Sequence, residues 1–104
     1  MDVECQAVRE RGFELLGLRG IDLSAEGLSV DSDVAVEKDE SVIVSIRLPG
    51  RRKWIDAEAT VTAVEAPATP SARRRLALRF RYVDPDAEPA LLDALVDELV
   101  GQAT

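Results

Sequence analysis

Residues 54–65 read Trp-Ile-Asp-Ala-Glu-Ala-Thr-Val-Thr-Ala-Val-Glu, and residues 74–83 read Arg-Arg-Leu-Ala-Leu-Arg-Phe-Arg-Tyr-Val. Apolar and polar residues alternate in both stretches, which is the pattern of β-strands with one face on a core. The inward positions predicted for the first strand are Ile55, Ala57, Ala59, Val61 and Ala63. Those predicted for the second are Leu76, Leu78, Phe80 and Tyr82. These two strands indicate a mainly β fold.

A third alternating stretch, residues 41–48, precedes these two strands. One of its faces is formed by Val42, Val44, Ile46 and Leu48. The Pro49-Gly50 dipeptide predicts a turn that closes this strand. The Pro-Ala-Thr-Pro-Ser sequence at 67–71 predicts a loop between the two long strands.

The N-terminal part of the chain is less regular. Residues 3–8 predict a short first strand and residues 9–12 a turn. Residues 13–23 change phase at Gly17 and Gly20, which indicates bulges or a bend of the kind that a small barrel needs at its corners. The alternative is two short strands joined by a turn at Gly17. A turn at residues 22–27, where Gly27 can take a positive φ, then leads into a short strand containing Leu28 and Val30.

The end of the chain switches from strand to helix periodicity. Apolar residues recur at helical spacing at Leu91, Leu92, Leu95, Val96 and Leu99. Pro89 suits the first turn of a helix, and Gly101 is a plausible stop. We therefore predict one domain over residues 1–104, with about six strands between residues 3 and 83 and one helix over about 89–100.

Composition excludes several classes of chemistry. The chain has no histidine and one cysteine, which rules out histidine-based catalysis, the usual zinc sites and an internal disulfide. We predict no catalytic residue, no metal site and no cofactor. Catalysis by Asp56 and Glu58, two residues apart on one strand face, is the enzymatic alternative. For Cys5 we expect a small apolar residue in a strand.

The formal net charge of −7 argues against nucleic-acid binding, and we expect no DNA or RNA partner. Basic residues nonetheless gather in two stretches, 47–53 and 73–81, and only acids follow Arg81. Such asymmetry indicates a local anion site or a charged partner surface, and the alternative is solvated strand faces. No apolar run approaches the roughly 20 residues of a membrane span, and the acidic start differs from a signal peptide. We expect a cytoplasmic protein without membrane insertion.

Residues 22–27 read Asp-Leu-Ser-Ala-Glu-Gly, an Asp-x-Ser-x-x-Gly motif between two apolar β segments. This motif, the order of strands and the terminal helix together resemble the PilZ family, bacterial domains that bind the second messenger cyclic di-GMP. The ending at residues 76–84 also looks like that family's last strand and its lead into the helix. The resemblance covers roughly residues 3–100. It implies a six-stranded split β-barrel with one C-terminal α-helix and a non-enzymatic signalling role.

The resemblance implies that Asp22, Ser24 and Gly27 bind the ligand. A carboxylate can accept hydrogen bonds from guanine N–H groups, and a hydroxyl can donate to phosphate or base oxygens. Glycine allows a close approach of the backbone. The alternative is a plain turn capped by its own side chains.

The sequence departs from the family at one important point. PilZ receptors also carry Arg-x-x-x-Arg just before the first strand, and those arginines stack on guanine and pair with phosphates. Here Arg9 is followed four places later by Phe13, and Arg11 by Leu15. Losing several charge-assisted hydrogen bonds of about 1.5–3 kcal/mol each should lower affinity by orders of magnitude.

Two functions therefore remain open. In the first, the chain is a degenerate PilZ module that acts through protein contacts in motility or pilus control. Its candidate partner surface is Arg51, Arg52 and Trp54, although Trp54 is alternatively an edge residue covered by the helix. In the second, it is a cyclic di-GMP receptor whose clamp comes from a partner chain or from arginines between 73 and 81. The auxiliary cations proposed by name are Arg19, Arg73, Arg74 and Arg75.

Overall fold

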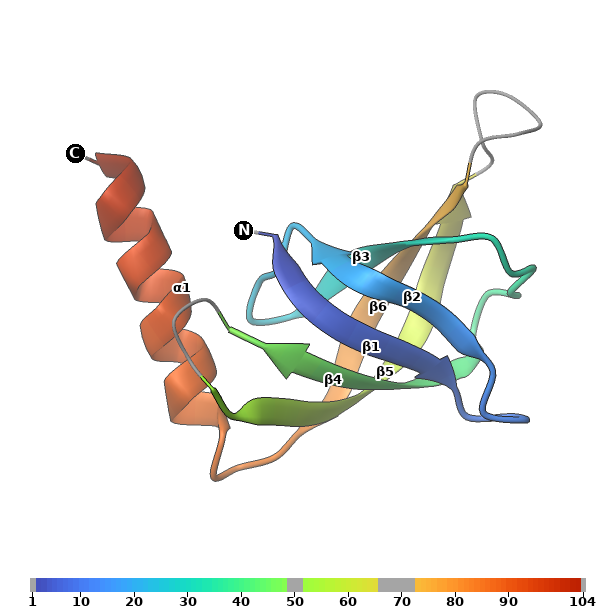
Figure 1. The fold of residues 1–104 in the computed structure, drawn as a ribbon, viewed down its shortest axis with the longest axis horizontal. Helices are drawn as coiled ribbons and strands as arrows, with labels where there is room; N and C mark the ends of the chain where they lie inside the picture. Colours follow the sequence, from blue (N-terminus) through green and yellow to red (C-terminus); the bar gives the residue numbers. More distant parts are fainter. Residues whose placement is uncertain (1, 49–51, 66–72, 104) are drawn as a thin grey trace.

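In the computed structural model, which describes residues 2–48, 52–65 and 73–103, six antiparallel strands close into a barrel (Figure 1). The ring order is β1-β2-β3-β6-β5-β4, and β1 pairs with β4 to close it. The elements are β1 (Val3–Arg9), β2 (Leu15–Ile21), β3 (Gly27–Ser32), β4 (Ser41–Arg47), β5 (Trp54–Glu65), β6 (Arg74–Val83) and α1 (Glu88–Ala103). The predicted β-barrel with a C-terminal helix is confirmed. The turn and loop expected at 49–50 and 67–71 lie outside the described residues.

The inward faces of the strands fill the barrel with small and branched apolar side chains. All four positions predicted for β4 and its end are buried, as are the first four predicted for β5. Burial of each valine, leucine or isoleucine side chain contributes about 1.5–3 kcal/mol relative to exposure, and of each alanine less. The least accessible members of this core are Cys5, Ala7, Val30, Val42, Val44, Ile46, Ala59, Val61 and Leu76.

Two β-bulges overturn part of the predicted alternation. The β5–β6 register shifts between Val61 and Ala63, so that Ala63 is exposed and Val64 packs against the core instead. A second shift lies between Glu58 and Ala59, opposite Arg81. Tyr82 is consequently 52% exposed, and Val83 takes the inward position. The predictions that Ala63 and Tyr82 face the core are therefore wrong, because an extra residue in one strand reverses the parity of those after it.

Strand β2 also changes phase, as the sequence predicted. Its pairing with β1 shifts register on both sides of the Ala7–Gly17 pair. The alternative of two strands with a turn at Gly17 is wrong, because β2 runs unbroken from Leu15 to Ile21. The ladder between β2 and β3 holds only the pairs Gly20–Val30 and Ile21–Ser29. This is the shortest ladder in the described part of the barrel.

Helix α1 lies beside the end of the barrel at which β1 begins and β4 ends (Figure 1). Ala87, Leu91 and Ala94 are buried in the core cluster, and Leu95 packs against it. Leu92 and Val96 are 44% and 57% exposed. The helix reaches Ala103, so the predicted stop at Gly101 is wrong. The side chain of Leu99, also predicted to be on the apolar face, is not among those that the structure describes.

Arg9, the last residue of β1, forms hydrogen bonds with several segments at the end of the barrel away from α1. Its Nη2 donates hydrogen bonds to Glu40 Oε2 at 2.8 Å and to the Ala35 carbonyl at 3.1 Å. Its Nη1 donates to Glu14 Oε1 at 2.8 Å. The hydrogen bond from Arg9, helped by one from the backbone N–H of Glu37, holds the pKa of Glu40 below its ordinary value. One guanidinium thus joins β1, the start of β2 and the segment before β4.

Candidate functional site

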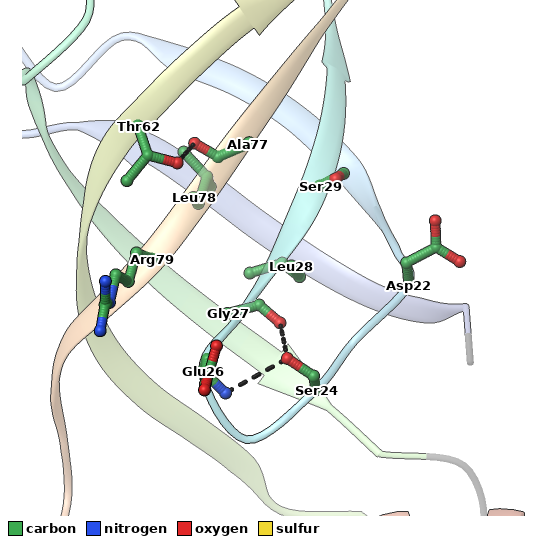
Figure 2. A pocket seen from close by; sticks show the side chains of 10 residues that line it. All are labelled: Asp22, Ser24, Glu26, Gly27, Leu28, Ser29, Thr62, Ala77, Leu78 and Arg79. Atoms are coloured by element: carbon green, nitrogen blue, oxygen red, sulfur yellow. Dashed lines mark hydrogen bonds between the residues drawn. The ribbon is translucent and has the colours of Figure 1, made fainter.

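An open hollow of about 280 Å³ lies on the outer surface of the barrel where the 22–27 turn meets β5 and β6 (Figure 2). Register explains the gathering. Within the β3–β6 ladder, Gly27 is opposite Arg79 and Ser29 is opposite Ala77. The lining residues are Asp22, Ser24, Glu26, Gly27, Leu28, Ser29, Thr62, Ala77, Leu78 and Arg79. The hollow therefore unites the candidate motif with outward positions of two distant strands.

The turn is closed by its own hydrogen bonds. The Ser24 N–H donates to the Gly27 carbonyl at 2.8 Å, and the Ser24 hydroxyl accepts from the Glu26 N–H at 3.2 Å. The same hydroxyl lies 3.4 Å from the Gly27 carbonyl oxygen, to which it donates (Figure 2). The Phe80 N–H donates to the Glu26 carbonyl at 2.7 Å, which ties the turn to β6. The hydrogen bonds of Ser24 therefore stabilise the turn itself, without a ligand.

Gly27 is required for a different reason from the one that the sequence suggested. Its φ is not positive, and the left-handed residue of the turn is Asp22, with φ 53°. A Cβ on Gly27 would overlap the Leu78 carbonyl oxygen and lie 2.9 Å from the carbonyl carbon of the same residue. The expectation of a positive φ at Gly27 is therefore wrong, because the glycine allows β3 to approach β6 closely.

Some charged groups that line the hollow form no hydrogen bond or ion pair with other described residues. Within the described part of the chain, neither the Asp22 carboxylate nor the Arg79 guanidinium has a hydrogen bond or ion pair. Figure 2 places these two side chains on opposite sides of the turn. Glu26 adds a second carboxylate to the lining. Among the described residues, the hollow thus offers one cation and two anions to a ligand.

Comparison with known proteins identifies the family. Residues 2–98 match the PilZ domain. The chain belongs to the PilZ domain family. Among solved structures, it is similar to the inhibitor of motility MotI/DgrA of Bacillus subtilis, with a TM-score of 0.78 and 20% sequence identity. That match covers 100% of this chain and 50% of the other, so this PilZ domain spans half of that protein's length. No curated protein matches the sequence.

The arginines that the sequence suggested as auxiliary cations of this PilZ domain lie elsewhere. Arg19 pairs with Asp2 at 2.8 Å, and Arg73 Nε pairs with Asp33 Oδ1 at 3.2 Å. Arg74 is half-buried opposite Ser32 and does not line the hollow.

Arg75 is the member of that set nearest the motif. It faces outward on β6, two residues before Ala77, and donates to Asp31 Oδ1 at 3.0 Å. That hydrogen bond, together with the charges of Asp31, Glu65 and Asp22, raises the pKa of Arg75 above its ordinary value. A phosphate would have to compete with Asp31 for this guanidinium.

Arg79 lines the hollow; it falls within the 73–81 range expected to supply a clamp but was not among the auxiliary cations proposed by name. Its signal was its parity, because it follows Arg75 and Ala77 at two-residue intervals on β6. What the sequence lacked was the register that places this position opposite Gly27. At about 3.3 Å per residue, the Arg75 and Arg79 side chains leave the strand roughly 13 Å apart. They are therefore spaced to meet two separate anionic groups.

The candidate partner surface around Trp54 is partly occupied by the protein itself. The Arg47 guanidinium carbon lies 5.8 Å from the centroid of the Trp54 ring, in a cation–π arrangement. Arg47 also pairs with Glu4. Trp54 is half-buried and Arg52 exposed, while Arg51 lies outside the described residues. This leaves part of the indole available to a partner.

The remaining candidate groups have ordinary surroundings. Asp56 accepts a hydrogen bond from the Ser45 hydroxyl at 2.8 Å, and Glu58 lies 3.6 Å from Arg81 Nη2. Cys5 is buried, and desolvation raises the pKa of its thiol to about 11. No described cluster of three His, Cys, Asp or Glu residues could hold a metal ion. No helix among the described residues is both long enough and apolar enough to cross a membrane.

Proposed function

We propose that this PilZ domain is a non-enzymatic signalling module that acts through protein contacts rather than through tight binding of cyclic di-GMP. The observation that carries the proposal is the state of the cations around the motif. Arg19, Arg73 and Arg75 each form an ion pair with a carboxylate. Among the described residues, Arg79 is the one basic residue that lines the hollow. A ligand with two phosphates would meet one free guanidinium and two carboxylates.

The motif itself is explained by the barrel. Ser24 and Gly27 have structural roles in the turn, so their presence does not require a ligand. A protein-contact function needs exposed apolar side chains instead, and large ones are available on several elements. The most exposed are Phe13, Leu15, Leu18, Tyr82, Leu92 and Val96. The structurally similar Bacillus subtilis protein is an inhibitor of motility, which supports control of motility as the process in which this module acts.

The second candidate function is that of a cyclic di-GMP receptor. It is favoured by the Asp22 carboxylate and the Arg79 guanidinium, which line one hollow and form no hydrogen bond or ion pair with other described residues. In this function, Asp22 accepts hydrogen bonds from a guanine edge and Arg79 meets a phosphate. Arg75 would join only after exchanging Asp31 for the ligand.

Calorimetric titration of the purified domain with cyclic di-GMP separates the two functions. We expect no saturable binding below about 10 μM, because each missing charge-assisted hydrogen bond costs about 1.5–3 kcal/mol. Sub-micromolar binding would overturn the protein-contact function. In that event, Asp22→Ala and Arg79→Ala should each weaken binding.

The matched control for Arg79→Ala is Arg19→Ala. Both substitutions remove one exposed arginine, but Arg19 is paired with Asp2 and does not line the hollow. Equal effects of the two substitutions would indicate a general charge effect rather than a site. Binding that is unchanged in Asp22→Ala would mean that the turn is purely structural.

A further inference from the structure

A row of outward side chains, apolar except for Glu58, crosses the outside of the barrel and meets β6 at Tyr82, three residues after the Arg79 that pairs with Gly27. Leu15 pairs with Val8, Val8 with Ile43, Ile43 with Glu58, and Glu58 with Tyr82. These five residues form what we call the transverse row, one outward side chain from each of β2, β1, β4, β5 and β6. At about 4.8 Å between neighbouring strands, the row extends roughly 19 Å around the barrel.

The row ends in side chains that are unusually open to solvent. Leu15 and Tyr82 are 47% and 52% exposed, and Val8 and Ile43 are half-buried. Beside Tyr82 the surface is hollowed by about 270 Å³, lined by Ile43, Asp56, Ala57, Glu58, Tyr82 and Asp84. An aromatic ring next to a hollow lined in part by apolar side chains, here Ile43 and Ala57, is typical of an anchor position in a protein interface.

The bulge at Arg81 puts the aromatic ring there. Without it, Tyr82 would follow Leu76, Leu78 and Phe80 into the core, in their parity. The register shift between Glu58 and Ala59 instead turns Tyr82 outward and gives the core position to Val83. Bulges re-aim side chains in this way and concentrate near functional surfaces. Exposing the tyrosine forgoes the burial of a large ring, which the barrel alone does not explain.

The charges around the hollow are negative. Asp56 and Asp84 have no ion pair among the described residues, although each accepts a hydrogen bond, from the Ser45 hydroxyl and the Asp86 N–H. Glu58 is partly compensated by Arg81, whose Nη2 also lies 3.7 Å from Glu10. The rim of the hollow therefore carries uncompensated carboxylates beside an apolar and aromatic strip.

We infer that the transverse row is the docking surface for a basic protein segment that carries apolar side chains between its arginines or lysines. The apolar side chains of the segment pack against Ile43 and Tyr82. Its cations meet Asp56 and Asp84, and one of them lies against the Tyr82 ring. The inference rests on the proposed protein-contact function and names the face that performs it.

The same charges disfavour the other occupants of such a surface. A second copy docked face to face would add the same carboxylates to a rim on which Asp56 and Asp84 already lack an ion pair among the described residues. A phosphate-rich surface, whether nucleic acid or anionic lipid, would meet the same repulsion. A basic segment alone gains from both the apolar row and its rim.

The test is a titration of the isotope-labelled full chain, followed by NMR, with three short synthetic peptides. The first alternates leucine and arginine, the second replaces arginine by glutamate, and the third replaces leucine by serine. We expect the leucine–arginine peptide alone to shift the amide signals of residues 43, 56–58 and 82–84. Tyr82→Ala should weaken this binding about tenfold, since an interface anchor contributes more than 1 kcal/mol.

Leu92→Ala is the matched control, because Leu92 is an exposed apolar residue on the helix. Binding that survives Tyr82→Ala, or that Leu92→Ala weakens equally, overturns the inference. So does absence of binding, equal binding of the glutamate peptide, or signals of the row that move with protein concentration alone. Peptide binding that maps to another surface would overturn the assignment of this face but not the protein-contact function. Tight cyclic di-GMP binding would contradict the protein-contact function itself.

Discussion

Replacing Gly27 by alanine tests whether the glycine of the family motif serves the barrel or a ligand. The added Cβ would overlap the Leu78 carbonyl oxygen and lie 3.0 Å from the Arg79 Cα. Both obstacles are backbone atoms of β6, so no side chain can rotate away. Relief requires β3 and β6 to separate, which strains the hydrogen bond from Phe80 N–H to the Glu26 carbonyl.

The expected loss of stability follows from these contacts. Overpacking against a fixed wall costs about 1–3 kcal/mol, and each weakened backbone hydrogen bond about 1 kcal/mol. We therefore expect Gly27→Ala to lower the free energy of unfolding by about 2–4 kcal/mol. With a urea slope of about 1.5 kcal/mol per molar, the unfolding midpoint would fall by about 1–3 M.

Gly12 supplies the control, because it needs glycine for another reason. Its φ is +79°, and nothing lies within 4 Å of an added Cβ. Gly12→Ala should cost about 1–2 kcal/mol, and Gly12→Asn less, since asparagine tolerates a left-handed backbone. Asparagine should bring no such relief at position 27. If Gly27→Ala unfolds within about 0.5 kcal/mol of the wild type, in the range of ordinary surface substitutions, the close-approach argument is refuted.

Three further predictions concern the barrel. Glu40→Gln should lower stability at neutral pH and flatten the decline of stability in acid. Because the pKa of Glu40 is lowered in the folded state, its contribution to stability is complete above about pH 4.5 and is lost as the pH falls through the folded-state pKa. Urea denaturation at a series of pH values would measure this. Cys5, with a thiol pKa of about 11, should react with a disulfide reagent at pH 8 only in denaturant, and fast labelling of the native protein would contradict its burial. Leu76→Ala should cost about 2–5 kcal/mol in the same unfolding assay, and a loss below 1 kcal/mol would place Leu76 outside the core.

Much of the barrel could be predicted because its core strands obey one simple period. Val42, Val44 and Ile46 are buried where alternation placed them, and the helical spacing near Leu91 did become a helix. These features depend on local residue order, which a single sequence contains. The phase change at Gly17 was also legible, because glycine marks positions where strands bend.

The two bulges between β5 and β6 could not be predicted, because no residue type at either position indicates a bulge. The shifts fall at Thr62 and Arg81, and both residue types are common in regular strands. A bulge depends on how two strands distant in sequence fit each other, and here it decides that Tyr82 faces solvent.

The candidate site was half predictable for a related reason. The motif at 22–27 is local, whereas its neighbours Thr62 and Arg79 arrive through strand pairing. Two of the arginines chosen from the charge run, Arg73 and Arg75, are paired with the nearby carboxylates of Asp33 and Asp31. Charge runs show which residues are basic, but only the register shows which of them remain unpaired.

The distinction between paired and unpaired groups also limits what the family motif says about function. Ser24 and Gly27 are used by the turn and the strand contact, so any chain that builds this barrel in this way has reason to keep them. Ligand binding instead depends on groups that form no hydrogen bond or ion pair with other described residues, which in this hollow include the carboxylates of Asp22 and Glu26 and the Arg79 guanidinium. A domain can therefore retain the fold and most of the motif while its cations turn to internal ion pairs. Under those conditions we expect a partner to bind at the row ending in the exposed Tyr82 rather than at the motif.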